Sequence, residues 1–478
     1  MTDIKETLAA VTRVRSWLGI PFATAQRFRR PVISEFDPNR HYNRKGVAPV
    51  QSSSLDWLGA ESGTGEDCLN LNVWAPEPVA ETSLPVIVYI YGGGFEVGAN
   101  SQVTSNASGL AATGRVVAVS VNYRLGALGA ISLSQYGGRL AEASNLCLQD
   151  VIAALGWVKK NIAFFGGDPT NVTVIGHSGG GMQTLALLGA PSADGLYRRL
   201  AGFSGGASRL IPAWWAEELA ELFLNELGIA DNPEKLLEMD TAPMIAAQQK
   251  VVPRDIGARN GVDNQSIGLV LDADQPGGVL GAHPMDVLAA GTHRQIDLLL
   301  STASNEIGWW VANDLERFDP HCVDNVIAEV RRWRIPRSRA RLIVNAYNQG
   351  GRTPAEVRGD ILTDWIYLLP AARGALSHAA AGGNALLLMI GPADGAPAVH
   401  GTELYALVGQ EEPNQSPDQA SRDHRIRNVV LDFATSNNAG LWSPVSNRPV
   451  SGSAGNLFCD PAIYYQRVLD SFANIARP

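Results

Sequence analysis

A serine stands among glycines in the segment NVTVIGHSGGGM, residues 171–182. Its surroundings, Gly176-His177-Ser178-Gly179-Gly180, fit the G-x-S-x-G pattern of a nucleophilic serine held on a sharp turn. A serine hydroxyl is a weak nucleophile unless a base takes its proton and an acid orients that base. The segment therefore predicts acyl transfer through Ser178, although by itself it fits a plain tight turn equally well.

His400 is the histidine best placed to act as that base. It follows the apolar run NALLLMIG (384–391) and the loop PADGAPAV (392–399). A parallel sheet presents catalytic groups at the carboxyl ends of its strands, where this loop would lie. The other histidines that come after Ser178 lack a strand and loop before them, and we expect them to be surface or packing residues.

The acid should also follow a strand, between the serine and the histidine in chain order. Glu306 lies five residues past Ser301, the end of the predicted strand in QIDLLLSTASNEIGWW. Asp297 falls inside that strand, and Asp394 belongs to the loop of His400 itself, so both are weaker candidates. We therefore predict that Glu306 orients the histidine, although a glutamate in a loop is more commonly just a solvated acid.

A run of three glycines directly after an apolar strand offers the backbone donors that a tetrahedral oxyanion needs. The segment YIYGGGF (89–95) has no Lys-Ser/Thr after its glycines, which argues against a phosphate-binding loop. With the amide of Gly179 at the start of the next helix, Gly93 and Gly94 are the predicted oxyanion donors. The alternative is an ordinary flexible turn.

Strands and helices that would position these groups alternate along the chain. One clear helical pattern covers 145–165, where apolar residues recur with a period of 3.6. Alternation of this kind predicts an α/β fold with a mostly parallel sheet covered by helices on both faces. The apolar, strand-like runs are 85–91, 116–123, 172–176, 200–204, 296–301 and 385–390.

Two long stretches without strong strand signals interrupt this alternation, 211–290 and 312–383. Insertions at the carboxyl edge of a sheet commonly build lids or pocket walls. We expect both stretches to be helical insertions that cover the active site, within a single domain that spans residues 1–478.

Composition and charge limit the kinds of partner that we expect this protein to bind. The net charge is −9, with 45% hydrophobic and 18% charged residues, as in a soluble globular protein without a nucleic-acid footprint. Charged residues interrupt the N-terminal segment, so we expect no signal peptide and a cytoplasmic protein. No apolar run is long enough to span a bilayer. The four cysteines are scattered, which predicts neither a metal site nor a disulfide framework.

Several ordered blocks then resemble one known family. They include EDCLNLNVW (66–74), YIYGGGF (89–95), VNYRLGALG (121–129) and HGTELYALVG (400–409). Over nearly its whole length the chain is similar to the type-B carboxylesterases, the cholinesterase-like branch of the α/β-hydrolases, and in particular to bacterial members. The resemblance implies an α/β-hydrolase fold, a Ser178–Glu306–His400 triad, and hydrolysis through an acyl-enzyme without a metal or cofactor.

The chain also departs from the family pattern. The family usually has G-E-S-A-G, whereas His177 and Gly179 replace the glutamate and the alanine here. The loss of that carboxylate weakens any expectation of quaternary-ammonium substrates. Cys68 stands where secreted members form a disulfide, but no cysteine precedes it, and Ile307 replaces the usual glycine after the acid.

These features predict a serine carboxylesterase that acts on uncharged, rather apolar small-molecule esters. Phe95, Trp309 and Trp310 lie next to the predicted catalytic loops and are candidate pocket residues, although aromatic residues after strands are as often core. His177 is a further pocket candidate, which we expect to be structural rather than catalytic. Hydrolysis of carbamates or aryl amides by the same triad is the alternative, and a non-catalytic binding homologue is less favoured. The sequence does not indicate an oligomeric state.

Overall fold

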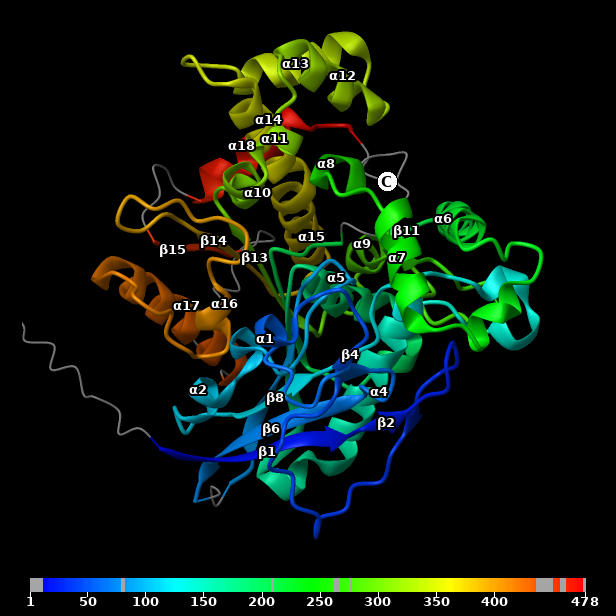
Figure 1. Cartoon of the computed structure of the whole chain (residues 1–478). Helices are drawn as coiled ribbons and strands as arrows, with labels where there is room; N and C mark the ends of the chain where they lie inside the picture. Colours follow the sequence, from blue (N-terminus) through cyan, green and yellow to red (C-terminus); the bar gives the residue numbers. More distant parts are fainter. Residues whose placement is uncertain are drawn as a thin grey trace, which may run out of the picture.

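The computed structural model describes residues 12–78, 82–207, 210–260, 266–275, 277–435, 450–455 and 461–475. Within these residues a central sheet has the strand order β1-β6-β8-β7-β9-β10-β13-β14-β15 (Figure 1). From β8 to β15 neighbouring strands run parallel, whereas β6 is antiparallel to both β1 and β8. The strands are β1 (Arg13–Pro21), β6 (Asn70–Glu77), β7 (Leu84–Ile90), β8 (Val117–Val121), β9 (Gly167–His177), β10 (Arg199–Phe203), β13 (Asp297–Ala303), β14 (Ala385–Ile390) and β15 (Val450–Ala454).

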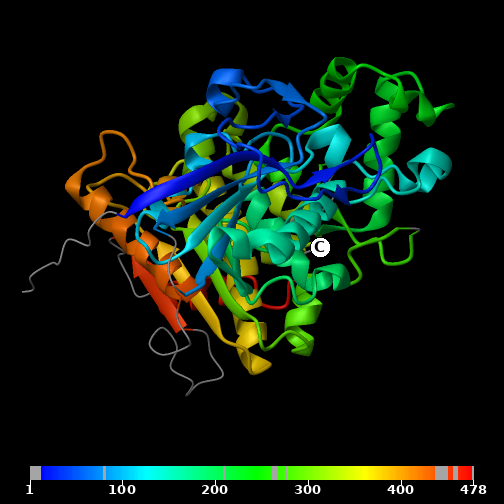
Figure 2. The same cartoon turned by 90° about the horizontal axis from the view of Figure 1, so that it is seen from below.

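All residues of β8, β10, β13 and β14 are buried. Since successive side chains point to opposite faces of a sheet, both faces of these strands must be covered. The covering helices include α4 (Leu146–Asn161), α5 (Gly179–Ala186), α15 (Leu369–Ala380) and α17 (Pro417–Thr435). Figure 2, seen from below, shows the sheet surrounded by helices. The six predicted strands and the predicted helix at 145–165 are therefore present, and the mostly parallel sheet is confirmed.

The antiparallel strands β1 and β6 were not predicted. β1 is half-exposed and lacks a continuous apolar run. β6 is buried but contains Asn70 and Asn72, whose side-chain amides donate to the carbonyls of Val47 and Asn100 at 2.8 and 3.0 Å. These hydrogen bonds remove the cost of burying the amides, so polar residues stand where a sequence pattern expects apolar ones.

The two stretches expected to be insertions consist largely of helices. The first contains α6 (Ala213–Glu226), α7 (Thr241–Val251), α8 (Ile256–Arg259) and α9 (Pro284–Ala290), together with the short strand β12 (Leu269–Val270), which pairs with β11 (Leu210–Ile211). The second contains α11 (Leu315–Phe318), α12 (Val323–Arg332), α13 (Arg337–Tyr347), α14 (Pro354–Thr363), a π-helix over Asp364–Leu368, and α15. Figure 1 shows α12 and α13 at the top of the molecule and α6 and α7 at its right.

Two further features bear on the predicted partners. No helix in the described ranges has the length and apolarity needed to cross a bilayer. The same ranges hold no cluster of three or more His, Cys, Asp or Glu side chains suited to a metal ion.

Candidate active site

Ser178 lies on the turn between β9 and α5. Its φ of 53° is unusual for a residue with a side chain and marks local strain. Glycine is required on both sides of this turn. A Cβ added at Gly176 would stand 2.2 Å from the carbonyl oxygen of Gly180, and one at Gly180 would stand 2.2 Å from the carbonyl oxygen of Ile90. The glycines thus let the chain turn tightly enough to hold the serine at the end of the sheet.

The three predicted triad residues meet in one hydrogen-bonded chain. His400 Nε2 lies 2.9 Å from Ser178 Oγ, and His400 Nδ1 lies 2.8 Å from Glu306 Oε2. The loops that carry the histidine and the acid are joined by a backbone hydrogen bond, 3.1 Å long, from the His400 amide to the Glu306 carbonyl. With its proton on Nδ1, the imidazole presents the Nε2 lone pair to the serine hydroxyl, which is the arrangement that general-base catalysis needs.

Glu306 is fully buried, and burial raises the pKa of its carboxyl above the usual range of a glutamate. Hydrogen bonds from the Ser204 hydroxyl and the Ala303 amide oppose that rise. The Ala303 amide donates to Oε1 at 2.8 Å, while Oε2 faces His400. These donors favour the carboxylate form, which the orientation of the His400 Nδ1–H requires.

The predicted oxyanion glycines lie next to the serine. The φ angles of Gly93 and Gly94 are 120° and 65°, and a Cβ on Gly93 would stand 1.9 Å from the Val97 carbonyl oxygen. A Cβ on Gly179 would stand 3.2 Å from the amide nitrogen of Gly94 and 3.3 Å from that of Phe95. Backbone amides of this loop thus converge on the start of α5, beside Ser178.

A cavity of about 470 Å³ opens over these residues. Its walls include the glycine loop, Ser178 and His400, together with His177, Trp309 and Trp310 from the predicted pocket set. Residues from the predicted insertions complete the walls, namely Ile256, Asn260 and Tyr367. Trp309 is 46% exposed and stands at the solvent-facing side, whereas Trp310 contacts His400 with a ring-centroid distance of 5.1 Å.

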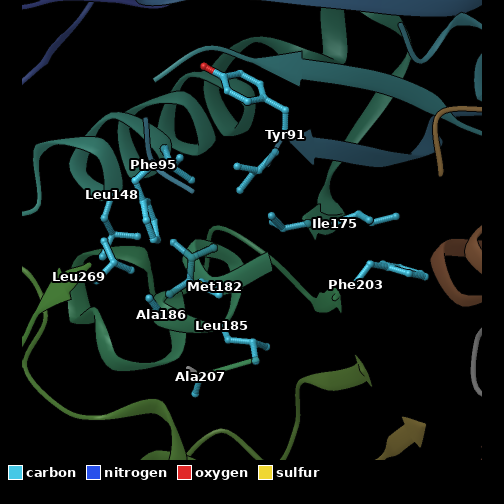
Figure 3. Packing of buried hydrophobic residues seen from close by; sticks show 14 of the residues in the cluster. Tyr91, Phe95, Leu148, Ile175, Met182, Leu185, Ala186, Phe203, Ala207 and Leu269 are labelled. Carbon is cyan, nitrogen blue, oxygen red and sulfur yellow. The ribbon is translucent and has the colours of Figure 1, made fainter. Parts of the chain in front are cut away.

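The prediction that Phe95 lines the pocket is wrong. Its φ is 69°, and its side chain is fully buried in the hydrophobic core. Figure 3 shows it among Leu148, Met182 and Leu269. The residue follows the glycine loop in sequence, but the loop reverses the chain and turns this ring away from the cavity. Only its backbone remains at the site.

His177 is buried against His400, at a ring-centroid distance of 4.9 Å. Burial, and then the neighbouring His400, lower the pKa of His177 well below its usual value, so this imidazole is neutral. No hydrogen bond between His177 and the Ser178 hydroxyl is present among the described residues. Its ring instead points toward Glu403, with Nε2 3.6 Å from Oε1 of that carboxyl.

Sequence reasoning missed three residues of the site: Tyr367, Ser204 and Glu403. The Tyr367 ring lies 5.1 Å from the His400 ring and comes from the π-helix, for which the sequence carries no simple signal. Ser204 ends an apolar run that the sequence predicts as a strand. Glu403 belongs to the HGTELYALVG block, and its position three residues after His400 was the available signal.

Known proteins resemble this chain in sequence and in fold. A sequence model described as the carboxylesterase family matches residues 4–438. The chain belongs to the carboxylesterase family. The para-nitrobenzyl esterase of Bacillus subtilis (strain 168) is 36% identical over 303 residues, which cover 61% of this chain and 59% of that protein. The fumonisin B1 esterase of Sphingopyxis macrogoltabida is 32% identical over 310 residues, which cover 61% of this chain and 53% of that protein. The alignments thus span less than two thirds of either relative.

Solved structures match over more of the chain. A PNB esterase structure superimposes with a TM-score of 0.79 at 28% identity, covering 95% of this chain and 96% of that one. A Geobacillus stearothermophilus carboxylesterase gives a TM-score of 0.81 at 26% identity, with the same coverage. The predicted α/β-hydrolase fold is therefore confirmed.

Proposed function

We propose that this protein is a serine carboxylesterase that hydrolyses uncharged carboxylic esters of small molecules. The observation that carries the proposal is the continuous hydrogen-bonded chain from Ser178 through His400 to Glu306. Family membership and two esterase relatives support it. A non-catalytic homologue is disfavoured because every group of the triad is present and oriented.

In the first step, Ser178 Oγ attacks the ester carbonyl carbon while His400 Nε2 takes the hydroxyl proton. Glu306 holds the imidazole through Nδ1 and stabilises the imidazolium that forms. Collapse of the tetrahedral intermediate breaks the bond to the alcohol oxygen, which receives the proton from His400. This leaves the acyl group on Ser178.

In the second step, water attacks the acyl-enzyme, and His400 takes a proton from that water. The second tetrahedral intermediate then releases the carboxylic acid and returns the proton to Ser178. In both steps we assign the amides of Gly93, Gly94 and Gly179 to the developing oxyanion. Loss of one such donor typically costs about 10²- to 10³-fold in kcat.

The aromatic residues of the cavity wall support a preference for esters whose acyl or alcohol part is flat and apolar. Its outer wall includes Trp57 and Trp309, which are 54% and 46% exposed, and Trp310 lies deeper, beside His400. Arg259 also reaches the wall, but its charge is paired with Glu96. Two relatives are named para-nitrobenzyl esterase and fumonisin B1 esterase, and these names support ester substrates. Carbamates and aryl amides remain the alternative substrates for the same triad.

The test is hydrolysis of p-nitrophenyl esters of increasing acyl length by the wild-type protein and by Ser178→Ala. The proposal expects turnover that is lost in Ser178→Ala, with an optimum acyl length set by the cavity. Folded wild-type protein that turns over no ester, but does turn over a carbamate or an aryl amide, would favour the alternative. The cytoplasmic location and the lack of a cofactor stay predictions.

A further inference from the structure

A strongly cationic segment joins two helices at the top of the molecule. Residues 331–341 contain six arginines and no acidic residue, although the whole chain has a net charge of −9. These arginines lie at the end of α12, in the link to α13 and at the start of α13 (Figure 1). Five of them are exposed, and a 62% exposed leucine follows them on α13. We call this group the arginine surface, which consists of Arg331, Arg332, Arg334, Arg337, Arg341 and Leu342.

The arginine surface differs from the other arginines of the same insertion, which are ion-paired. These pairs are Arg317 with Asp314, Arg352 with Asp360, and Arg358 with Asp255 and Glu329. In the described part of the chain, none of the six arginines at 331–341 forms an ion pair with a carboxylate. Arg339, which is half-buried, donates instead to the backbone carbonyl of Ser471 at 3.0 Å. The five exposed guanidinium groups thus present their charge to the outside of the molecule.

The stability of the two helices does not account for all of these charges. Cations at the end of α12 do stabilise that helix, because they interact favourably with a helix C-terminus. At the start of α13 the sign is unfavourable, since Arg337 and Arg339 place cations at a helix N-terminus. Arg337 and Arg341 also repel each other four residues apart on the same face. Arg334 has a φ of 59°, in the region that favours glycine. These arginines therefore cost stability, which indicates a role in binding.

A second charged region, of opposite sign, lies on α6 and the segment that follows it. Residues 217–240 contain eight acidic residues and one lysine, and all eight acidic residues are exposed. On the outward face of α6, two large apolar side chains stand among the carboxylates, with Trp214 49% and Leu222 37% exposed. We call this face the acidic surface, which consists of Trp214, Glu217, Glu218, Glu221 and Leu222.

The two surfaces are complementary in charge and similar in size. Each has charges of one sign around at least one exposed apolar side chain, and arginine and tryptophan are the residues that most often anchor protein–protein contacts. The 14 residues of α6 make a helix about 21 Å long, and the 11 residues of α13 make one about 16 Å long. Figure 1 shows α6 at the right of the molecule and α12 and α13 at its top, so the two surfaces do not meet within one chain.

We propose that the acidic surface of one chain binds the arginine surface of a second copy of the same chain. This inference goes beyond the proposed function and does not depend on it. Since the contact joins two different surfaces, it gives either a two-fold dimer held by two such contacts or an open chain of copies held by one contact each. Salt weakens the contact, because the charges that form it are exposed in the free protein.

Sedimentation velocity over a range of protein concentrations measures this contact. At about 0.05 M NaCl the average mass should exceed that of one chain and rise with concentration, and at about 0.5 M NaCl it should fall toward one chain. The arginine variant carries Arg337→Glu and Arg341→Glu, and the glutamate variant carries Glu217→Arg and Glu221→Arg. Each variant should raise the dissociation constant at least about tenfold, because it places like charges opposite each other.

A matched control separates the contact from an effect of net charge. Arg294→Glu with Arg425→Glu gives the same net charge as the arginine variant, and both residues are exposed and lie outside the two surfaces. The control should associate like the wild-type protein. Circular dichroism should show that all three variants are folded, since every substituted side chain is exposed.

Mixing the two variants tests whether the two surfaces bind each other. The arginine variant retains the acidic surface, and the glutamate variant retains the arginine surface. Each variant alone should sediment as a single chain, whereas an equimolar mixture should form a complex of two or more chains. A mixture that stays monomeric would show that the surfaces do not bind each other and would overturn the proposal.

Three further results would also overturn it. The first is wild-type protein that remains a single chain at low salt and high protein concentration. The second is self-association that both variants retain, or that the control loses to the same extent. The third is monomeric wild-type protein that binds vesicles of an anionic phospholipid while the arginine variant does not, because the arginine surface would then face a membrane.

Discussion

Replacing Glu306 by glutamine should disable the base while keeping the shape of the site. In the wild-type protein the Ala303 amide donates to Oε1, and Oε2 receives the Nδ1–H of His400. In the Glu306→Gln variant the Ala303 amide can donate only to the carbonyl oxygen of the introduced side chain, so the NH2 group must face His400. Nδ1 then has to accept a hydrogen bond, and the imidazole proton moves to Nε2.

An imidazole with its proton on Nε2 cannot take the proton of Ser178, whose Oγ lies 2.9 Å from that atom. The equivalent change in the serine proteases lowers kcat by about 10⁴-fold through the wrong tautomer. Since each tenfold step is about 1.4 kcal/mol, the corresponding loss here is about 5.5 kcal/mol of transition-state stabilisation. We expect a decrease in kcat of about 10³- to 10⁴-fold with little change in KM.

The assay is steady-state hydrolysis of a p-nitrophenyl ester, with circular dichroism to establish that the variant is folded. Asp394→Asn is the matched control, because Asp394 is an exposed carboxylate in the loop of His400 and asparagine tolerates its φ of 51°. That control should stay within about threefold of the wild-type kcat. A folded Glu306→Gln variant that loses less than about tenfold would refute the assignment of Glu306 as the orienting acid.

Substitutions at four residues outside the triad give further predictions. Burial raises the pKa of Asp364 to about 7, so its contribution to stability is present below about pH 4 and lost as pH rises through 7. Urea unfolding should therefore show that Asp364→Asn gains stability relative to the wild type as the pH rises from about 5 to about 8. A stability difference that stays constant over this range would contradict the prediction. Asp150→Ala removes the ion-pair partner of the buried Arg124 and should lower the free energy of unfolding by about 3–5 kcal/mol. A decrease of less than about 1 kcal/mol would contradict this prediction. Phe95→Ala should cost about 3–5 kcal/mol of stability without changing the preferred acyl length. Trp309→Ala should change the preferred acyl length and leave the unfolding midpoint unchanged. If instead Phe95→Ala changed the preferred acyl length and Trp309→Ala lowered the stability, Phe95 would be shown to line the pocket.

The triad positions could be predicted from the sequence because each follows a buried strand in a parallel sheet. The carboxyl ends of such strands lie at one edge, so Ser178 after β9, Glu306 after β13 and His400 after β14 had to approach one another. Chain order then fixed which residue could have which role. The nearly continuous apolarity of the central strands allowed both the strands and their mostly parallel arrangement to be predicted.

Other features depend on contacts between distant segments, and no local pattern reveals them. The half-exposed edge strand β1 is held by pairing with β6 rather than by its own apolarity. The prediction for Phe95 failed because the direction of its ring depends on a positive φ, which the sequence does not display. The hydrogen bond from the Ser204 hydroxyl to Glu403 joins residues that are 199 positions apart in the chain.

The proposed mechanism depends on acyl transfer through Ser178. The most direct measurement is labelling with a p-nitrophenyl alkylphosphonate, which leaves a stable adduct on an activated serine, followed by peptide mass spectrometry. We expect one adduct per chain on the peptide that contains Ser178, one equivalent of released p-nitrophenol, and neither of these in Ser178→Ala. An adduct on another residue, or equal labelling of Ser178→Ala, would contradict it.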